Sequence, residues 1–232
     1  MDTKLTGKTR IESDLIGARE IPAEALYGVQ TLRGIENFSI SKFRLSEYPL
    51  FIKGLAITKM AAAMANFELG LLTVEQKDAI IAACGEILDG KHHDQFPVDM
   101  IQGGAGTTTN MNANEVIANR ALELMGHERG EYQYCSPNDH VNCSQSTNDA
   151  YPTAIHIGMY FKHLQLLPHL EELIASFRKK GEEFSQIIKM GRTQLEDAVP
   201  MTLGQTFNGF ASILQDEIAH LNEAAADFLV VN

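Results

Sequence analysis

The sequence has no tryptophan and only three cysteines among its 232 residues, which are Cys84, Cys135 and Cys143. No two of them have the Cys-x-x-Cys spacing of metal or redox sites, and an odd, sparse set does not form a disulfide framework. This usage is typical of a reducing compartment, so we expect a cytoplasmic protein. Basic residues are also few: 19 lysines and arginines against 30 aspartates and glutamates give a net charge of −11. That balance argues against a nucleic-acid-binding surface.

Signals for membranes and cofactors are missing as well. The chain has no run of 18 apolar residues and no apolar core in its first twenty residues, so we expect neither a membrane span nor a secretion signal. His92, His93 and Asp94 lack a companion ligand pair at metal-site spacing, which favours a solvated loop. Residues 103–109 (GGAGTTT) match neither a nucleotide-hydrolase phosphate loop nor the dinucleotide fingerprint. We therefore expect no metal and no organic cofactor.

What the sequence does contain is helical periodicity. Apolar residues at three- and four-residue steps predict helices over residues 50–69, 73–88 and 112–125. Thr73 and Gln76 have the spacing of a capping box at the start of the second helix. A glycine follows each of the three helices as a suitable stop. These elements predict a helical core in the first half of the chain.

The segments outside these helices favour irregular structure. Residues 1–45 carry scattered glycines and short apolar groups, which indicate extended or irregular segments. Arg33 in this part is either an anion contact or, as we favour, a structural or surface arginine. His140 follows Asp139 in a polar stretch; it is either a general base or, more often for a lone histidine in a loop, a structural residue.

Two much longer helices are predicted in the C-terminal part of the chain, over residues 150–190 and from Met201 to the end. Pro168 is expected to kink or divide the first helix. Residues 191–200 are expected to form a tight polar connector. The second helix reaches the last residue, Asn232, without a capping signal, so we expect the chain to be cut short there.

The apolar stripes of these long helices determine the expected fold class. Two such helices cannot bury their stripes against each other alone, which predicts a multi-helix bundle completed by missing sequence, by other subunits or by both. We therefore expect a mainly α protein with an N-terminal mixed and helical domain at residues 1–143. A bundle domain with very long helices, lacking its C-terminal part, is expected at residues 144–232.

Residues 142–152 (NCSQSTNDAYP) gather short polar side chains just ahead of the first long helix. Serine, threonine, asparagine and aspartate cap helix N-termini, and Pro152 suits a first helical turn. Because a helix start carries unsatisfied N–H groups and partial positive charge, donors placed there can hold a carboxylate. A plain cap is the alternative interpretation. Residues 103–109 also have two interpretations. A glycine-rich loop with three threonines either approaches a ligand closely or forms a turn into the next helix.

Three of these stretches together resemble the aspartase/fumarase superfamily: residues 103–115 (GGAGTTTNMNANE), 144–149 (SQSTND) and 191–200 (GRTQLEDAVP). Residues 94–97 (DQFP) and 137–142 (PNDHVN) extend the likeness, which runs from about residue 10 to the end. The resemblance implies homotetramers whose central helices form one large bundle. It also implies active sites that are built from several subunits.

Two details favour the aspartase branch of the superfamily, whose members interconvert L-aspartate with fumarate and ammonia. Thr147 stands where fumarases typically have a second serine. Gln194 stands where fumarases and several other members, including some aspartases, have histidine, and a glutamine can only donate or accept hydrogen bonds. A fumarase or another superfamily lyase is the first alternative. A non-catalytic helical assembly module, in which the motifs serve only as caps and turns, is the second.

The resemblance implies six substrate-binding residues, which are Thr107, Ser146, Thr147, Asn148, Thr193 and Gln194. Removing the poorly acidic Cβ proton of aspartate gives a carbanion whose charge flows into the β-carboxylate as an aci-carboxylate. Ser146 and Thr147, near a helix start, would stabilise that growing charge.

The remaining roles follow from the same resemblance. Thr107 and Asn148 would orient the amino group and carboxylate, while Thr193 and Gln194 would contact the α-carboxylate and amino end. The superfamily's base is a serine in a later Gly-Ser-Ser loop, and no part of residues 1–232 matches that loop. We therefore expect the catalytic base downstream of Asn232 and no turnover by this chain alone.

Overall fold

The computed structural model describes residues 7–231, which divide into two compact units. The first contains residues 7–159 together with Val231, and the second residues 160–230. The division by contacts falls inside a long helix, sixteen residues after the domain boundary that we expected ahead of Ser144. That expected boundary stays a prediction. The mainly α fold class is confirmed, because helices make up most of both units.

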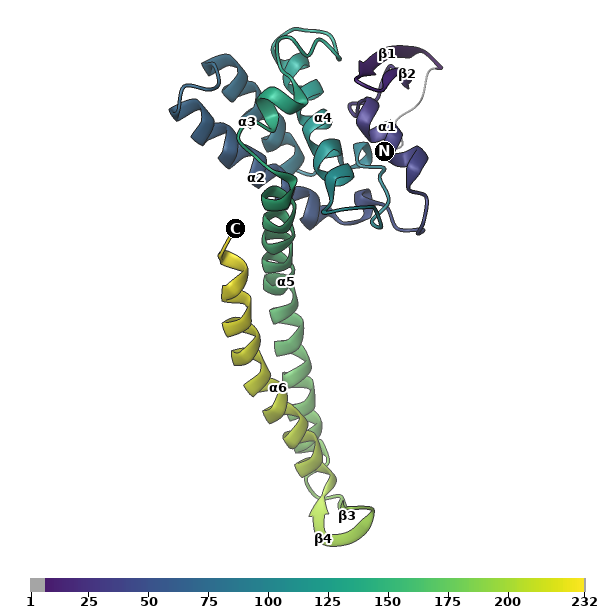
Figure 1. Ribbon diagram of the computed structural model, residues 1–232. Helices are drawn as coiled ribbons and strands as arrows, with labels where there is room; N and C mark the ends of the chain where they lie inside the picture. The colour runs from purple at the N-terminus through teal and green to yellow at the C-terminus, as the bar shows by residue number, and fades with distance from the viewer. Residues whose placement is uncertain (1–6, 232) are drawn as a thin grey trace. The chain divides into compact units, whose positions relative to one another are not determined.

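Three helices form the core of the first unit (Figure 1): α2 (Pro49–Glu68), α3 (Val74–Leu88) and α4 (Thr107–Leu124). Their inward faces bury residues such as Ile52, Ile80 and Val116 completely. Thr73 and Gln76 form the predicted capping box at the start of α3. The first two helices lie within two residues of their predicted bounds. Helix α4 begins five residues earlier than predicted.

The first part of the unit is more ordered than the expected irregular chain. Strands β1 (Thr9–Asp14) and β2 (Gly17–Pro22) pair as an antiparallel hairpin. Helix α1 (Val29–Asn37) follows and packs against α4. Gly34 permits this approach, because a Cβ there would collide with the side chain of Thr108. The prediction of extended or irregular segments therefore agrees with the strands within residues 9–22 and was wrong for the helix at residues 29–37.

Short helical turns complete the first unit. Two 3₁₀ turns occupy Leu45–Glu47 (η1) and His93–Gln95 (η2). A π-helical turn, η3 (Pro137–Val141), lies in the stretch that we expected to be irregular. The Ser136 hydroxyl accepts hydrogen bonds from the backbone N–H groups of Asn138 and Asp139 and so caps this turn.

Helix α2 is long and apolar enough to cross a membrane by length and composition. It nevertheless packs against α3 and contacts α4, and it buries the polar side chains of Lys59 and Asn66. A helix at the centre of a protein core passes the same test of length and composition. The packing identifies α2 as a core helix of the first unit.

Helix α5 (Thr147–Glu183) is one uninterrupted element of 37 residues, about 55 Å long. Its first turns belong to the first unit, where Gly54 of α2 lets the backbone approach that of Ala154 closely. Of the two outcomes expected at Pro168, the division of the helix was wrong, because the helix continues through this residue, and the kink stays a prediction. A proline removes a single i to i−4 hydrogen bond, and the many remaining bonds of so long a helix maintain it.

The second unit is a helical hairpin with a small sheet at its turn (Figure 1). Residues 191–200 lie within an antiparallel pair, β3 (Ile188–Thr193) and β4 (Glu196–Thr202), so the predicted tight polar connector takes the form of a β-hairpin. Helix α6 (Leu203–Ala226) then returns along α5, with Phe177 packed against Phe207 and Phe210.

The end of the last helix differs from the prediction. Helix α6 ends at Ala226, and one 3₁₀ turn, η4 (Asp227–Leu229), follows it. The predicted helix to the last residue was therefore wrong by several residues. Asn232 itself lies outside the described residues.

Candidate substrate site

The start of α5 presents the polar cluster that the sequence indicates. Thr147 is the first helical residue, and the Ser146 hydroxyl accepts a hydrogen bond from the backbone N–H of Asn148 at 3.1 Å. Ser146 and Asn148 are exposed and Thr147 is half-buried. Ser146 therefore acts as a cap, while its own proton stays available to an incoming acceptor. The cap and the binding role are compatible.

Pro152 lies further along the helix than we expected. It is the sixth residue of α5 and not part of the first turn. Because proline has no N–H, the carbonyl of Asn148 receives no hydrogen bond from residue 152. The hydrogen-bond ladder of α5 therefore lacks one bond close to the hydroxyl cluster.

The glycine-rich loop lies against this helix start. Gly106 adopts a φ of +91°, and a Cβ there would collide with the ring of Tyr151. Only glycine combines this backbone angle with this close approach. A cavity of about 490 Å³ lies between the two segments and is lined by residues including Gly104, Gly106 and Asn148. The structure therefore brings two of the three motif stretches together around one cavity.

Thr107 is the first residue of α4 and is exposed. It lines a second, larger cavity of about 700 Å³, together with Gln30 and Arg33 of α1 and Asn138 of η3. Arg33 is engaged by Asp14, with Nε and Nη2 donating to the carboxylate at 2.9 and 2.8 Å. This ion pair is the structural role that we favoured for Arg33. Thr107 and Asn148 line different cavities, which adjoin through Gly106 and Thr107.

A buried polar network lies beneath the helix start. The fully buried Lys59 ammonium donates to Asn142 Oδ1 at 2.9 Å and to Gln145 Oε1 at 3.0 Å. Asn110 of α4 donates through Nδ2 to the same Asn142 oxygen and to the Thr147 hydroxyl, both at 3.1 Å. Burial lowers the pKa of Lys59 to about 7. The network connects the α2 core to a predicted substrate-binding hydroxyl.

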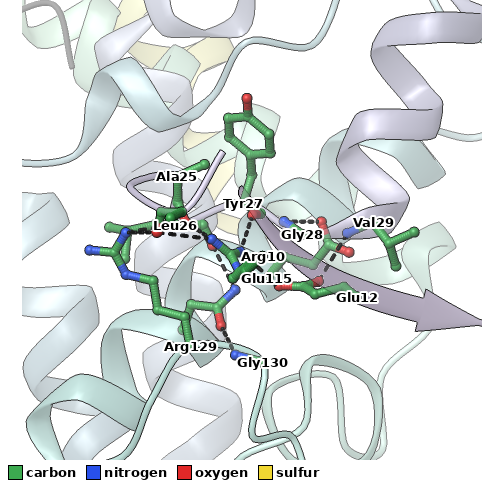
Figure 2. A network of polar contacts seen from close by, with 12 residues as sticks. Arg10, Glu12, Ala25, Leu26, Tyr27, Gly28, Val29, Glu115, Arg129 and Gly130 are labelled. Atoms are coloured by element: carbon green, nitrogen blue, oxygen red, sulfur yellow. Dashed lines mark hydrogen bonds and ion pairs between the residues drawn. The ribbon is translucent and has the colours of Figure 1, made fainter. Parts of the chain in front are cut away.

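A second network fixes the wall of the larger cavity (Figure 2). The buried Glu115 carboxylate of α4 accepts hydrogen bonds from the backbone N–H groups of Gly28, Gln30 and Thr31 at 2.8 to 3.0 Å. Glu12 accepts from the Val29 N–H at 3.1 Å. Two carboxylates from distant segments thus cap α1, because Gly28 supplies no capping side chain.

The same network explains two pKa shifts. Burial raises the pKa of Glu115, although its N–H donors oppose that rise. Burial also raises the pKa of Tyr132 well above its ordinary value, and its hydroxyl donates to Glu12 at 2.9 Å. Arg10 donates to the other oxygen of Glu12 from Nε and Nη2 at 2.9 and 2.7 Å. The arginine charge offsets the burial of this carboxylate.

The histidines of the first unit have structural partners. His140 Nδ1 accepts from the backbone N–H of Ser136 at 2.7 Å, and burial lowers its pKa. His92 contacts Glu86 at 2.7 Å, and His93 contacts the carbonyl of Ile87. Within residues 7–231, no group of three or more histidine, cysteine, aspartate or glutamate side chains could hold a metal ion.

Thr193 and Gln194 belong to the second unit, at the tip of the β3–β4 hairpin. Both are exposed. Gln194 and Leu195 adopt φ values of +49° and +65°, which close a two-residue hairpin turn. A glutamine in this left-handed conformation is uncommon and marks a constrained position. The part of these two residues in a substrate site stays a prediction.

Sequence reasoning missed the residues beneath the site, namely Lys59, Asn110 and Asn142. The sequence did hold a pattern that indicates a buried polar network. It places Lys59 on the apolar stripe of a predicted core helix and asparagines at positions 110 and 114 of α4. Buried polar residues are costly unless they are hydrogen-bonded. Their occurrence at core positions therefore indicated a polar network.

Comparisons with known proteins agree with the motifs. The lyase family profile matches residues 17–232. The aspartate ammonia-lyases of Pseudomonas canavaninivorans and Escherichia coli K12 are 58% and 55% identical, over 95% and 98% of this chain. The matches cover 46% and 48% of those proteins, so the chain spans about half the length of the curated relatives.

Solved structures give the same result. A native crystal structure described as fumarate lyase:delta crystallin from Brucella melitensis has a TM-score of 0.93 and 53% identity, over 97% of this chain and 52% of that one. A class II fumarase from Schistosoma mansoni has a TM-score of 0.88 and 37% identity, over 97% and 47% of the two chains. These values confirm the superfamily resemblance that the three motif stretches indicated, and the chain belongs to the lyase family.

Proposed function

We propose that the protein containing this chain is an aspartate ammonia-lyase, which interconverts L-aspartate with fumarate and ammonia. The observation that carries the proposal is the hydroxyl cluster of Ser146 and Thr147 at the start of α5, next to a cavity bordered by the glycine-rich loop. The high identity to aspartate ammonia-lyases over nearly all of the chain supports the choice of substrate.

The chemistry requires a site that binds a carboxylate more tightly as its charge increases. Loss of the Cβ proton of aspartate places a second negative charge on the β-carboxylate, and the C–N bond then breaks to release ammonia. Neutral hydroxyl donors and the helix start stabilise that charge without prior pairing to a counter-ion. The β-carboxylate itself takes up the electrons, so the reaction requires no organic cofactor.

The other residues of the proposed site have complementary roles. Thr107 and Asn148 orient the amino group and carboxylate. Thr193 and Gln194 contact the α-carboxylate end, and the serine base comes from a segment outside residues 1–232. This division of the site accords with a homotetramer in which several subunits build each site.

The cellular setting is proposed on composition. All three cysteines are free thiols, with Cys84 and Cys135 buried, which supports a cytoplasmic location. The acidic balance argues against a nucleic-acid partner, and it means that the proposed dicarboxylate substrate is held by local donors rather than by overall attraction. No membrane partner is proposed.

The test is product formation by the full-length enzyme from L-aspartate and from L-malate. Ammonia release with fumarate absorbance from aspartate, and negligible dehydration of malate, is the expected result. Ready turnover of malate without ammonia release from aspartate would instead indicate a fumarase, the alternative that the Schistosoma mansoni structure favours. Residues 1–232 alone are expected to turn over neither substrate.

Substitution of the donors separates an enzyme from a helical assembly module. Ser146→Ala and Thr107→Ala in the full-length enzyme should each lower kcat/KM about tenfold or more, as loss of one oxyanion donor does. Glu128→Ala, at an exposed position that lines neither cavity, serves as a general surface control. A change in melting temperature with unchanged kinetics would favour the non-catalytic module.

A further inference from the structure

We propose that Asn110 is a positioning residue that turns the Thr147 hydroxyl into an outward hydrogen-bond donor for the substrate carboxylate. This inference rests on the proposed function and adds to it a buried residue that touches no substrate. It depends on the direction of each hydrogen bond in the network under α5, which the heavy-atom contacts determine.

The directions are fixed first at Gln145 and Asn142. Gln145 Nε2 donates to the carbonyls of Val141 and Cys143 at 2.9 and 3.1 Å, so its Oε1 is the atom that meets Lys59. Asn142 Nδ2 donates to the Gln145 carbonyl at 3.0 Å. Its Oδ1 therefore has to face the interior as an acceptor.

Three donors converge on that oxygen. Lys59 Nζ, Asn110 Nδ2 and Asn114 Nδ2 lie 2.9, 3.1 and 3.2 Å from Asn142 Oδ1. Because two amide oxygens cannot share a hydrogen bond, Asn110 must direct its NH₂ group, and not its oxygen, toward Asn142. The same NH₂ group lies 3.1 Å from the Thr147 hydroxyl oxygen.

The Thr147 hydroxyl oxygen therefore accepts a hydrogen bond from Asn110 Nδ2, on the buried side of the helix start. Within the part of the chain that the structure describes, its own proton has no acceptor. A hydroxyl that already accepts one hydrogen bond can direct its proton only away from Asn110. Thr147 is half-buried and does not itself line the 490 Å³ cavity, but its neighbour Asn148 does. On this proposal, a carboxylate held at Asn148 comes within reach of the Thr147 proton.

The network is unfavourable as a purely structural device. The oxygens of Asn110 and Asn114 are buried without a partner among residues 7–231, and a buried, unpaired acceptor destabilises a fold. Lys59 is buried with amide oxygens as its hydrogen-bond acceptors. Groups that break local packing rules in this way cluster at functional sites.

The test compares two asparagines of α4 in the full-length enzyme. Asn110→Leu should lower kcat/KM about tenfold. Asn112→Leu is the matched control, because Asn112 is also buried with an unpaired oxygen, but its NH₂ group donates to the Gln95 carbonyl instead. The control should leave kcat/KM within twofold of the parent enzyme, even where it lowers the melting temperature.

A double-mutant cycle with Thr147→Val identifies the route of the effect. If Asn110 acts through the hydroxyl, Asn110→Leu should change kcat/KM by less than twofold once that hydroxyl is gone. A full tenfold further loss in the Thr147→Val background would overturn the proposal. Equal kinetic losses in Asn110→Leu and Asn112→Leu would overturn it as well.

A second variant covers the case in which Asn110→Leu does not fold. Asn110→Asp keeps the shape, but its carboxylate accepts the Thr147 proton and turns it inward. It should lower kcat/KM at least tenfold in the parent enzyme and less than twofold in the Thr147→Val background. The same tenfold loss in both backgrounds contradicts the proposal.

The outcome stays separable from that of the proposed function. The parent enzyme is assayed with L-aspartate and L-malate in parallel. If it turns over neither substrate, the proposed lyase function is refuted, but the positioning role of Asn110 is not. Fumarate affinity measured by calorimetry then decides the positioning role. Asn110→Leu should weaken fumarate binding about tenfold and Asn112→Leu should not, and equal affinities in the two variants would refute the role.

Discussion

At the residue scale, Lys59 is the most unusual group in the first unit, because its ammonium is buried with amide oxygens as its hydrogen-bond acceptors. Burial lowers its pKa from 10.5 to about 7, and the titratable group that acts on it from the adjoining helix α3 is Cys84. Burial raises the pKa of that thiol to about 12, so Cys84 stays neutral at physiological pH. The charge of Lys59 is therefore opposed mainly by its own desolvation.

This shift predicts a pH dependence of stability. Between pH 7 and about 10 the unfolded lysine holds a proton that the folded lysine has released, so unfolding takes up a proton and becomes less favourable as pH rises. The free energy of unfolding should therefore increase by up to about 1.4 kcal/mol per pH unit, relative to Lys59→Met. Urea unfolding at pH 7.5 and 9 measures the slope. Lys53→Met, on the same helix but not buried, should keep the parent slope, and an unchanged slope in Lys59→Met would refute the shift.

At the element scale, prediction succeeded where the signals were local. Helices α2 and α3 carry their own apolar periodicity, and α3 also carries a capping box within four residues. Helix α1 was missed because its caps, Glu12 and Glu115, are 17 and 87 residues away from the N–H groups that they accept from. The β3–β4 hairpin was missed because its turn has Gln194 and Leu195 in place of the usual asparagine and glycine. The hydroxyls of the site were predictable as a cap motif, whereas the direction of their protons depends on contacts between three helices.

The remote caps of α1 give a prediction for that element. Glu115→Gln leaves one amide oxygen where two carboxylate oxygens accepted three N–H bonds, and it places an NH₂ group against a backbone N–H. Hydrogen bonds to charged groups contribute about 1.5–3 kcal/mol each, so the free energy of unfolding should fall by about 3 kcal/mol. Chemical denaturation measures the loss. Glu128→Gln, at an exposed position, should stay within about 0.5 kcal/mol of the parent, and a similar value for Glu115→Gln would contradict the capping role.

At the scale of the whole molecule, the long helices expose much apolar surface in the second unit. Side chains at least two-fifths exposed there include Leu164, Leu173, Phe210 and Ile213. A helical hairpin with apolar residues on its outer face requires further helices to cover them. The proposed homotetramer, with its central helices in one bundle, would supply that cover. The proposal that the full-length protein forms this tetramer predicts the molecular mass of the protein in solution.

Light scattering coupled to gel filtration tests this assembly. The full-length protein should have four times the mass of its chain, and Ile213→Lys should shift it to smaller species, because a lysine buried in a bundle is costly. Glu223→Lys changes an exposed polar position of the same helix and should leave the tetramer intact. Since each site is proposed to draw on several subunits, Ile213→Lys should also lose activity in proportion to the loss of tetramer. A monomeric species with full activity would show that one chain builds a complete site, and the shared-site proposal would then fail.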